Sequence, residues 1–263
     1  MFEFHEDKVR YFDMQYRTSK EYIIPFISPH LDFRQNRQIL EIGCAEAGVL
    51  KAFVDEGHIC TGIELNQSRV EVAKSFLKKD IEDGKVQIIN KNIFDIDANE
   101  FSFKFDLIIL KDVIEHLPNQ QIFIHELKKL LNPNGFIFFG FPPWQMPFGG
   151  HQQICKSKLA AFLPYYHILP RFFYKGLLKT FREKNDTINE LLEIKDCGIS
   201  IEKFERIARQ EGYQVVQQKH FFINPIYKFK FNINVRKQAK IITKIPYFRN
   251  YLTTAVYYLI KQA

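Results

Sequence analysis

The chain has 263 residues, of which 46% are hydrophobic and 25% are charged. This is the composition of a globular protein, and it excludes a disordered chain. The length lies between that of one large domain and that of two small ones. The 27 phenylalanines are enough to build a large core and still supply aromatic side chains for a pocket. No apolar run approaches the roughly 18 residues of a membrane-spanning helix.

The four cysteines, Cys44, Cys60, Cys155 and Cys197, are far apart and form no Cys-x-x-Cys pair. This spacing predicts neither a disulfide framework nor a zinc cluster, and we expect no metal site. Residues 1–7 contain no basic segment followed by an apolar one, so we expect no signal peptide. Together these features predict a cytoplasmic protein with reduced cysteines.

The net charge of +7 is unevenly distributed. Residues 127–182 contain eight lysines and arginines, residues 212–263 contain nine, and neither segment contains an acidic residue. Two basic segments indicate a surface that meets a negative partner, such as nucleic acid or an anionic membrane. Ordinary surface charge that is paired in the fold is an equal alternative.

Apolar runs and turn signals alternate along most of the chain as strands and helices do. After a helical arm, strands are predicted at residues 38–42, 59–63, 85–90, 105–110 and 136–141, and helices between them at residues 46–56, 66–83 and 119–131. Strands that alternate with helices of this length predict βαβ units and a parallel sheet.

The alternation stops after the fifth strand, where a basic and aromatic segment follows. A helix is then expected at residues 201–211, followed by a hairpin-like pair of strands at residues 214–223 and 227–235. The predicted fold is one α/β domain with a Rossmann-like, seven-stranded, doubly wound sheet whose last strand is antiparallel. Its parts are a helical arm at 1–35, a cofactor-binding core at 36–142, an insertion at 143–197, the end of the core at 198–235, and a basic C-terminal extension at 236–263.

A glycine-containing loop joins the first strand to the following helix and reads Glu41-Ile42-Gly43-Cys44-Ala45-Glu46-Ala47-Gly48. Open α/β sheets bind nucleotides at this place. A phosphate-binding loop would need Lys-Ser or Lys-Thr after the last glycine, and Val49 and Leu50 stand there. A dinucleotide loop has a glycine where this chain has Ala45, and Glu46 would lie near the phosphates. S-adenosylmethionine has no phosphate and has a cationic end, so acidic residues here favour it.

Glu64 ends the second strand and is placed to accept hydrogen bonds from both hydroxyls of a ribose. NAD-binding sites also bind the ribose through an acidic residue at this position, so Glu64 does not distinguish NAD from S-adenosylmethionine. A structural alternative is that Glu64 caps the helix that begins near Asn66. After the third strand, an amide within residues 90–95 is placed to accept the amino group of an adenine.

These pieces resemble class I S-adenosylmethionine-dependent methyltransferases over residues 38–141. The most specific part pairs the glycine loop with Asp112-Val113-Ile114-Glu115-His116, which is similar to the small-molecule branch that includes ubiquinone-type O-methyltransferases. The resemblance implies S-adenosylmethionine as the cofactor. The contact residues that it implies are Glu41, Gly43, Cys44 and Gly48 around the methionine part, Glu64 and Leu65 at the ribose, Asn92 and Ile93 at the adenine, and Lys111 through its carbonyl. Asn92 stands where the family usually has aspartate.

Methyl transfer is an in-line displacement, so the enzyme mainly positions the acceptor and excludes water. An oxygen acceptor must also lose a proton, and His116 and His151 are the best-placed histidines for this catalytic role. Ordering the following helix is an equal alternative for His116. The loop after the fifth strand carries Trp144, Phe148 and Gln152, and we expect these side chains to contact the substrate.

Tyr11 and Gln15 are four residues apart, so a helix would place them on one face. We expect the arm that carries them to form, together with the insertion, a lid over the cofactor.

The predicted acceptor is a small or lipid-linked molecule that is methylated on oxygen. RNA is the alternative acceptor because lysines and aromatics alternate at residues 227–231, although a strand with lysines on one face has the same pattern. Residues 241–260 are basic and aromatic, as in a segment that lies on the inner face of an anionic membrane, or in a helix that packs on the sheet. A non-catalytic scaffold that binds S-adenosylmethionine is the alternative from another class. The sequence indicates no oligomeric state.

Overall fold

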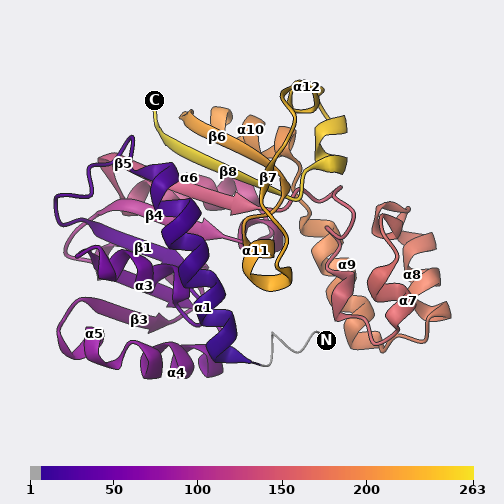
Figure 1. Cartoon of the computed structure of the whole chain (residues 1–263), viewed down its shortest axis with the longest axis horizontal. Helices are drawn as coiled ribbons and strands as arrows, with labels where there is room; N and C mark the ends of the chain where they lie inside the picture. Colours follow the sequence, from indigo (N-terminus) through magenta and orange to yellow (C-terminus); the bar gives the residue numbers. More distant parts are fainter. Residues whose placement is uncertain (1–6) are drawn as a thin grey trace.

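Helices cover both faces of a twisted, mostly parallel sheet in the computed structural model, which describes residues 7–263 (Figure 1). Within this range the eight strands follow the order β3-β2-β1-β4-β5-β8-β6-β7. They are β1 Gln38–Ile42, β2 Ile59–Glu64, β3 Val86–Asn90, β4 Phe105–Lys111, β5 Leu131–Phe141, β6 Tyr213–Ile223, β7 Arg236–Lys237 and β8 Ala255–Gln262. The strands β1 to β5 pair in parallel, and β8 is antiparallel to both β5 and β6. The predicted Rossmann-like fold is confirmed, with one strand more than expected.

The antiparallel strand comes from a different part of the chain than the sequence pattern indicated. The tail segment β8 lies inside the sheet, although residues 236–263 were expected to be an extension outside it. Its run Ala255–Ile260 is buried at every position, because helices or loops cover both faces of the sheet there. The expected strand at residues 227–235 is wrong, because the chain forms helix α11 (Ile226–Phe231) instead. The two-residue β7, which follows this helix, pairs with β6 at the outer edge of the sheet.

The helices form two layers around the sheet. They include α1 Lys8–Thr18, the π-helical η2 Ser19–Ile23, α2 Ile24–Ile27, α3 Gly48–Asp55, α4 Gln67–Phe76, α5 Lys78–Glu82, α6 Gln120–Leu130, α9 Asn185–Cys197 and α10 Ile201–Gln210. Alternate residues of β4 divide between the layers, since Leu107 and Ile109 pack with α2, α3 and α4, while Ile108 and Leu110 pack with α6 and α10. Burial of each such side chain contributes about 1.5–3 kcal/mol relative to exposure.

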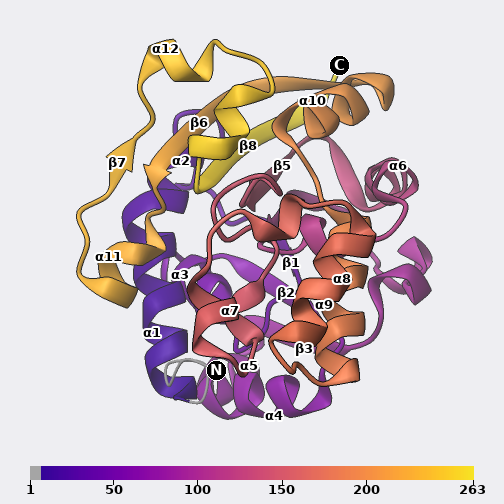
Figure 2. The same cartoon turned by 90° about the vertical axis from the view of Figure 1, so that its right-hand side faces the viewer.

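The predicted insertion stands beside the sheet and has an apolar cluster of its own (Figure 2). It contains α7 Lys158–Phe162, α8 Arg171–Thr180 and α9, together with the 3₁₀ turns η6 Gln152–Ile154 and η7 Tyr166–Ile168. Tyr166, Tyr174 and Leu178 are at the centre of this cluster. None of the helices in residues 7–263 is both long enough and apolar enough to cross a membrane.

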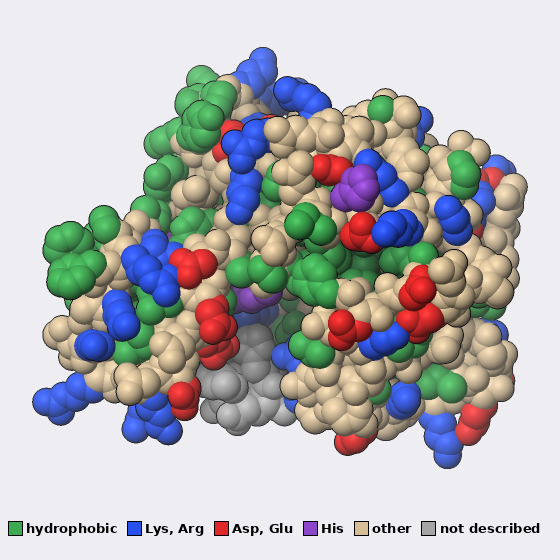
Figure 3. Space-filling model, turned by 180° about the vertical axis from the view of Figure 1, so that it is seen from behind, with side chains coloured by type: hydrophobic (Ala, Val, Ile, Leu, Met, Phe, Trp, Pro, Cys, Tyr) green, Lys and Arg blue, Asp and Glu red, His purple; other side chains and the backbone are tan. Residues whose placement is uncertain are grey.

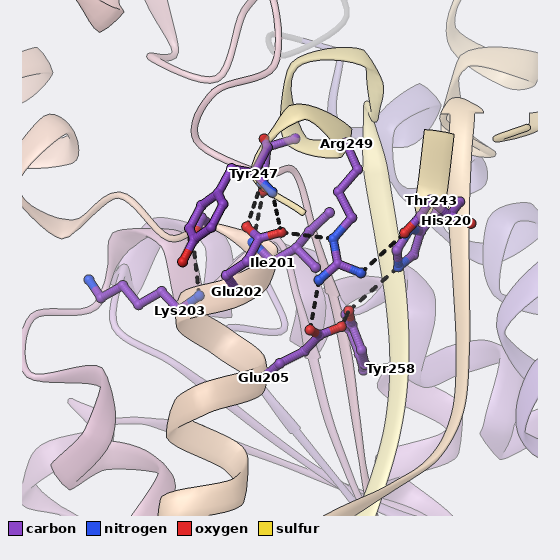
Figure 4. A network of polar contacts seen from close by, with 11 residues as sticks. Ile201, Glu202, Lys203, Glu205, His220, Thr243, Tyr247, Arg249 and Tyr258 are labelled. Carbon is purple, nitrogen blue, oxygen red and sulfur yellow. Dashed lines mark hydrogen bonds and ion pairs between the residues drawn. The ribbon is translucent and has the colours of Figure 1, made fainter. Parts of the chain in front are cut away.

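A partly buried ionic network attaches the segment before β8 to α10 (Figure 4). Arg249, in the 3₁₀ turn η8 (Phe248–Leu252), pairs with Glu202 at 2.8 Å and with Glu205 at 2.7 Å. Tyr258 of β8 donates a hydrogen bond to Glu205 at 2.7 Å. The network fixes the segment between α12 (Lys240–Thr243) and β8 against α10. Residues 241–260 are therefore a short helix, a turn and a strand, and not one continuous amphipathic segment.

Candidate cofactor and acceptor site

The loops that follow the parallel strands open on one edge of the sheet, and the glycine loop after β1 is at its centre. The backbone amides of Gly43 and Cys44 both donate to the carbonyl of Ile63, at 2.8 and 3.1 Å, which binds this loop to the end of β2. A cavity of about 60 Å³ lies against it. Its lining residues are Tyr11, Gln15, Glu41, Gly43, Cys44, Ala45, Glu46, Gly48, Val49, Arg69, Lys111 and Asp112.

Two buried charged side chains, Glu41 and Lys111, face this small cavity. Burial raises the pKa of Glu41 well above its usual range, with Lys111 opposing that shift. Burial also disfavours the charged form of Lys111, but Asp112 and Tyr11 outweigh it, so the pKa of Lys111 is raised. The Lys111 ammonium pairs with Asp112 at 2.5 Å, and one oxygen of Glu41 has no hydrogen-bond partner among the described residues. The unpartnered oxygen of Glu41 is therefore left to accept a hydrogen bond from a ligand group, and a cationic group would favour its charged form.

The side chain of Glu64 connects the glycine loop after β1 to the loop after β2. One carboxylate oxygen accepts from the amide of Ala45 at 2.9 Å and the other from the amide of Asn66 at 2.8 Å. The side chain of Asn66, rather than that of Glu64, caps α4. Each carboxylate oxygen has more than one lone pair, so Glu64 retains acceptor capacity for a ribose.

The predicted adenine end lies after β2 and β3. Leu65 is 68% exposed there, and Ile93 packs at the edge of the α6 layer. Asn92 accepts a hydrogen bond from the amide of Phe94 at 3.1 Å, which starts the short helix η3 (Ile93–Asp95). Sequence reasoning did not single out Asn90, whose amide donates to the carbonyls of Glu64 and Leu65 at 2.9 Å each. Asn90 thereby fixes the loop after β2 to the end of β3.

The N-terminal arm borders the cofactor cavity through α1. Tyr11 and Gln15 lie on one face as predicted, and the Gln15 amide donates to the Tyr11 hydroxyl at 2.9 Å. The arm packs closely on α3, because a Cβ added at Gly48 would lie 2.4 Å from the carbonyl oxygen of Phe12. Residues 1–6 of the predicted arm lie outside the described residues.

Besides α3, helix α11 packs against the described part of the arm (Figure 1). Its Tyr227 and Lys230 interact electrostatically with Asp112. Burial raises the pKa of Tyr227 to about 12 and lowers that of Lys230 to about 8. The sequence pattern missed both residues because it assigned them to a strand.

The predicted contacts in the loop after β5 have mainly structural partners. Trp144 donates its backbone amide to Ile199 at 2.8 Å, and its ring packs edge-on against His167. Gln152 is fully buried and donates to the carbonyls of Pro147 and Leu163. Phe148 is 36% exposed. The contacts of Gln152 and Trp144 thus stabilise the conformation of the loop.

His151 of the same loop meets His116 of η5 (Ile114–His116) at a second, larger cavity of about 490 Å³. The ring centroids are 4.6 Å apart and the rings are perpendicular. Burial lowers the pKa of both, that of His151 to about 3, so the imidazoles are neutral at neutral pH. The cavity is lined by His116, Pro118, His151, Ile154, Glu190, Glu193, Ile194, Asp196 and Cys197.

The wall of this second cavity is acidic. Glu190, Glu193 and Asp196 of α9 line it, although residues 143–182 of the insertion contain no acidic residue. Figure 3 shows acidic and histidine side chains at the hollow between the insertion and the sheet. Such a surface favours neutral or cationic ligands and repels a phosphate backbone.

The geometry agrees with what comparison with known proteins finds. A family model described as a methyltransferase domain matches residues 13–218. The chain therefore belongs to the methyltransferase-domain family, and its fold is that of the class I methyltransferases, whose methyl donor is S-adenosylmethionine.

Among curated proteins, the chain is similar to two ubiquinone biosynthesis O-methyltransferases. It is 28% identical over 142 residues to that of Histophilus somni, covering 51% of this chain and 58% of that protein. It is 32% identical over 116 residues to that of Rickettsia canadensis, covering 44% and 47%. The matches thus span about half the length of these relatives.

Solved structures show the same fold at low identity. A S-adenosylmethionine-dependent methyltransferase from Clostridium acetobutylicum aligns over 94% of this chain and 92% of its own, with a TM-score of 0.57 and 11% identity. The geranyl diphosphate C-methyltransferase from Streptomyces coelicolor aligns over 92% and 78%, with a TM-score of 0.55 and 12% identity.

Proposed function

We propose that this protein transfers the methyl group of S-adenosylmethionine to an oxygen atom of a small or lipid-linked acceptor. The observation that carries the proposal is the pair of cavities at the carboxyl edge of the sheet: Asp112 lines the first and interacts electrostatically with His116, which lines the second. Acidic side chains line the first cavity, which suits a donor that carries a positive charge and no phosphate. The second contains two neutral histidines, which suit an acceptor hydroxyl. The names of the curated relatives support oxygen as the acceptor atom.

The first cavity offers a partner for each polar part of the donor. Glu41 has a free oxygen for the cationic amino group, and Lys111 contributes its backbone carbonyl. Glu64 accepts the ribose hydroxyls, and the segment with Asn92 and Ile93 contacts the adenine. Asn90 keeps Glu64 in place for this task.

Methyl transfer at the second cavity needs orientation and removal of one proton. The sulfur–methyl bond breaks with its electron pair on sulfur, an oxygen–methyl bond forms, and the hydroxyl proton leaves the acceptor. His116 and His151 are the groups that activate the hydroxyl. The pKa of His151, about 3, makes it a weak base at neutral pH, so it orients the hydroxyl while His116 takes the proton.

An apolar groove near the insertion supports a lipid-linked acceptor. It has a volume of about 640 Å³ and is lined by Tyr165, Ile168, Leu169, Pro170, Phe248, Tyr251 and Leu252. On the adjoining helix α8, Phe172 and Phe173 are 81% and 62% exposed beside Arg171 and Lys175. Exposed aromatics with cationic neighbours are typical of contact with an anionic membrane surface.

Two measurements test the proposal. Calorimetry with S-adenosylhomocysteine should show binding to the purified protein, and its absence would refute the assignment of the donor. Labelled donor, incubated with an extract divided into RNA, lipid and small-molecule fractions, should label the lipid or small-molecule fraction. Label confined to nuclease-sensitive material would reverse the choice of acceptor.

A further inference from the structure

We propose that the cavity between α6 and α10 binds one phosphate group, either as free phosphate or as part of a small molecule. The cavity has a volume of about 580 Å³, and its walls come from the first turn of α6, the end of α9 and one face of α10. It shares Pro118, Asp196 and Cys197 with the cavity that contains His116 and His151. Methyl transfer as proposed uses none of its side chains. The cavity is therefore a second binding site beside that of the acceptor.

The first turn of α6 presents backbone N–H groups to this cavity. Asn119 precedes the helix with a φ of +50°, and its side chain makes no capping hydrogen bond. The amide of Phe123 donates to the carbonyl of Asn119, whereas the amides of residues 120–122 have no acceptor among the described residues. Residues 119–122 all line the cavity. Free amides at a helix N-terminus carry partial positive charge and bind anions.

Two cationic side chains of α10 line the cavity across from this turn. Lys203 and Arg206 are three residues apart, so they lie on one face of the helix. Lys203 donates to the carbonyl of Gly198 at 3.3 Å, and the acidic residue of the lining, Asp196, is paired with Arg171. Burial and the charge of Arg206 lower the pKa of Lys203. An anion between the two cations removes their repulsion.

The buried side chain of Gln120 gives an independent reason to place a ligand here. The residue lines the cavity and is 4% exposed. Its amide nitrogen donates to the carbonyls of Ile114 and Cys197, at 2.8 and 2.7 Å, which fixes the orientation of the amide. Its oxygen has no hydrogen-bond partner among the described residues. A buried acceptor without a donor is costly, and a ligand O–H group would remove that cost.

This combination of donors and acceptor favours phosphate over other anions. The helix amides and the two cations bind oxygen atoms, whereas the oxygen of Gln120 requires a proton. Inorganic phosphate and phosphate monoesters carry such a proton near neutral pH, since their last ionisation lies there. Sulfate and the phosphodiesters of nucleic acids carry none. Leu117, Ile122 and Ile207 form an apolar part of the wall, which suits the organic part of a phosphate ester.

The experiment measures phosphate binding to the full chain without relying on turnover. The protein is titrated by calorimetry with inorganic phosphate, and separately with sulfate, in a buffer that contains neither. We expect one phosphate per chain, and binding of sulfate that is weaker by about tenfold or more, which is the loss of one hydrogen bond to a charged group. Arg206→Gln and Lys203→Met should each weaken phosphate binding by about tenfold or more for the same reason.

A third variant separates loss of binding from loss of folding. Ile122 is 62% exposed in the first turn of α6. A carboxylate in this turn stabilises a helix but repels an anion at its N-terminus. Ile122→Glu should therefore bind phosphate at least tenfold more weakly while its unfolding temperature in phosphate-free buffer stays at or above that of the parent.

Arg209→Gln is the matched control, because it removes a cation from the same helix that lines a different cavity. It should keep the affinity for phosphate. Phosphate should raise the unfolding temperature of the parent and of Arg209→Gln, but not that of Ile122→Glu. The proposal is overturned if the parent binds no phosphate, if sulfate binds as tightly as phosphate, or if Arg209→Gln weakens binding as much as Arg206→Gln.

Two further measurements distinguish the sources of the phosphate. An extract is treated with a phosphatase and then incubated with labelled S-adenosylmethionine, an arm that rests on the proposed function. Loss of labelled product would assign the phosphate to the methyl acceptor, and retained labelling would assign it to a separate ligand. Titration with glycerol 3-phosphate then compares a phosphate monoester with free phosphate. Binding of phosphate without binding of S-adenosylhomocysteine would refute the assignment of the donor alone, and the reverse would refute the phosphate site alone.

Discussion

Replacing Gly48 with alanine tests whether the packing of α1 on α3 shapes the cofactor cavity. The added Cβ would lie 2.4 Å from the carbonyl oxygen of Phe12 and 2.9 Å from Cβ of Gln15. Because the nearest atom belongs to the backbone, rotation of a side chain cannot relieve the contact. To restore ordinary separation, α1 must move by about 1 Å, which displaces Tyr11 and Gln15 from the cavity.

Overpacking of this kind costs about 1–3 kcal/mol of stability. A loss of about 1.4 kcal/mol in the interactions with the cofactor would raise its Kd tenfold. We therefore expect Gly48→Ala to lower the unfolding temperature and to weaken binding of S-adenosylhomocysteine about tenfold in calorimetry.

Gly176→Ala is the matched control for this prediction. Gly176 lies in α8 with a negative φ, and a Cβ there would meet no atom within 4 Å. Alanine should stabilise that helix by up to about 1 kcal/mol without changing cofactor affinity. If Gly48→Ala bound the cofactor and unfolded as the parent protein does, the inferred role of the contact between α1 and α3 would be wrong.

Three further predictions concern single side chains. Arg249→Met removes the cation that Glu202 and Glu205 share, although hydrogen-bond donors remain at both carboxylates, and it should cost about 1–3 kcal/mol in chemical denaturation. Arg171→Met, at a 54% exposed ion pair, should cost less than about 1 kcal/mol, and equal losses would contradict this reasoning. Glu64→Gln should weaken binding of S-adenosylhomocysteine at least tenfold in calorimetry, since a neutral amide is a poorer acceptor for hydroxyls than a carboxylate; unchanged affinity would remove Glu64 from the ribose site. Burial and the charge of Arg249 lower the pKa of His220 to about 4 from 6.5, so its contribution to stability is complete above pH 6.5 and is lost as the pH falls towards 4, a change of about 3 kcal/mol. His220→Gln should flatten the fall of the unfolding temperature in this range, and an unaltered pH profile would count against the assignment.

Local sequence patterns determined the first half of the fold and the cofactor end of the site. The strands β1 to β5 are rich in apolar residues, with the longest run at residues 107–110 of β4, and a parallel sheet buried on both faces favours such runs. The loop 41–48 and Glu64 follow directly from those strands, because residues at the carboxyl ends of parallel strands meet at one edge. Tyr11 and Gln15 could be paired because a helix places residues four apart on one face.

The acceptor end was decided by contacts between distant segments. Residues 227–231 alternate lysine and aromatic residues as a strand does, yet Asn224 and Pro225 start a helix there, and α1 packs against it. The strand β8 could not be assigned because a short apolar run at a chain end fits a strand or a packed helix equally well. Its place between β5 and β6 depends on pairing with residues more than 30 positions away.

The meeting of His116 and His151 depends on tertiary structure in the same way. The two histidines are 35 residues apart, and no spacing in the sequence relates them to each other. Helix α9 packs against η5 and brings its acidic residues to the same cavity. Periodicity reports which face of an element is buried, whereas the identity of the neighbour across a cavity is set by how the whole chain folds.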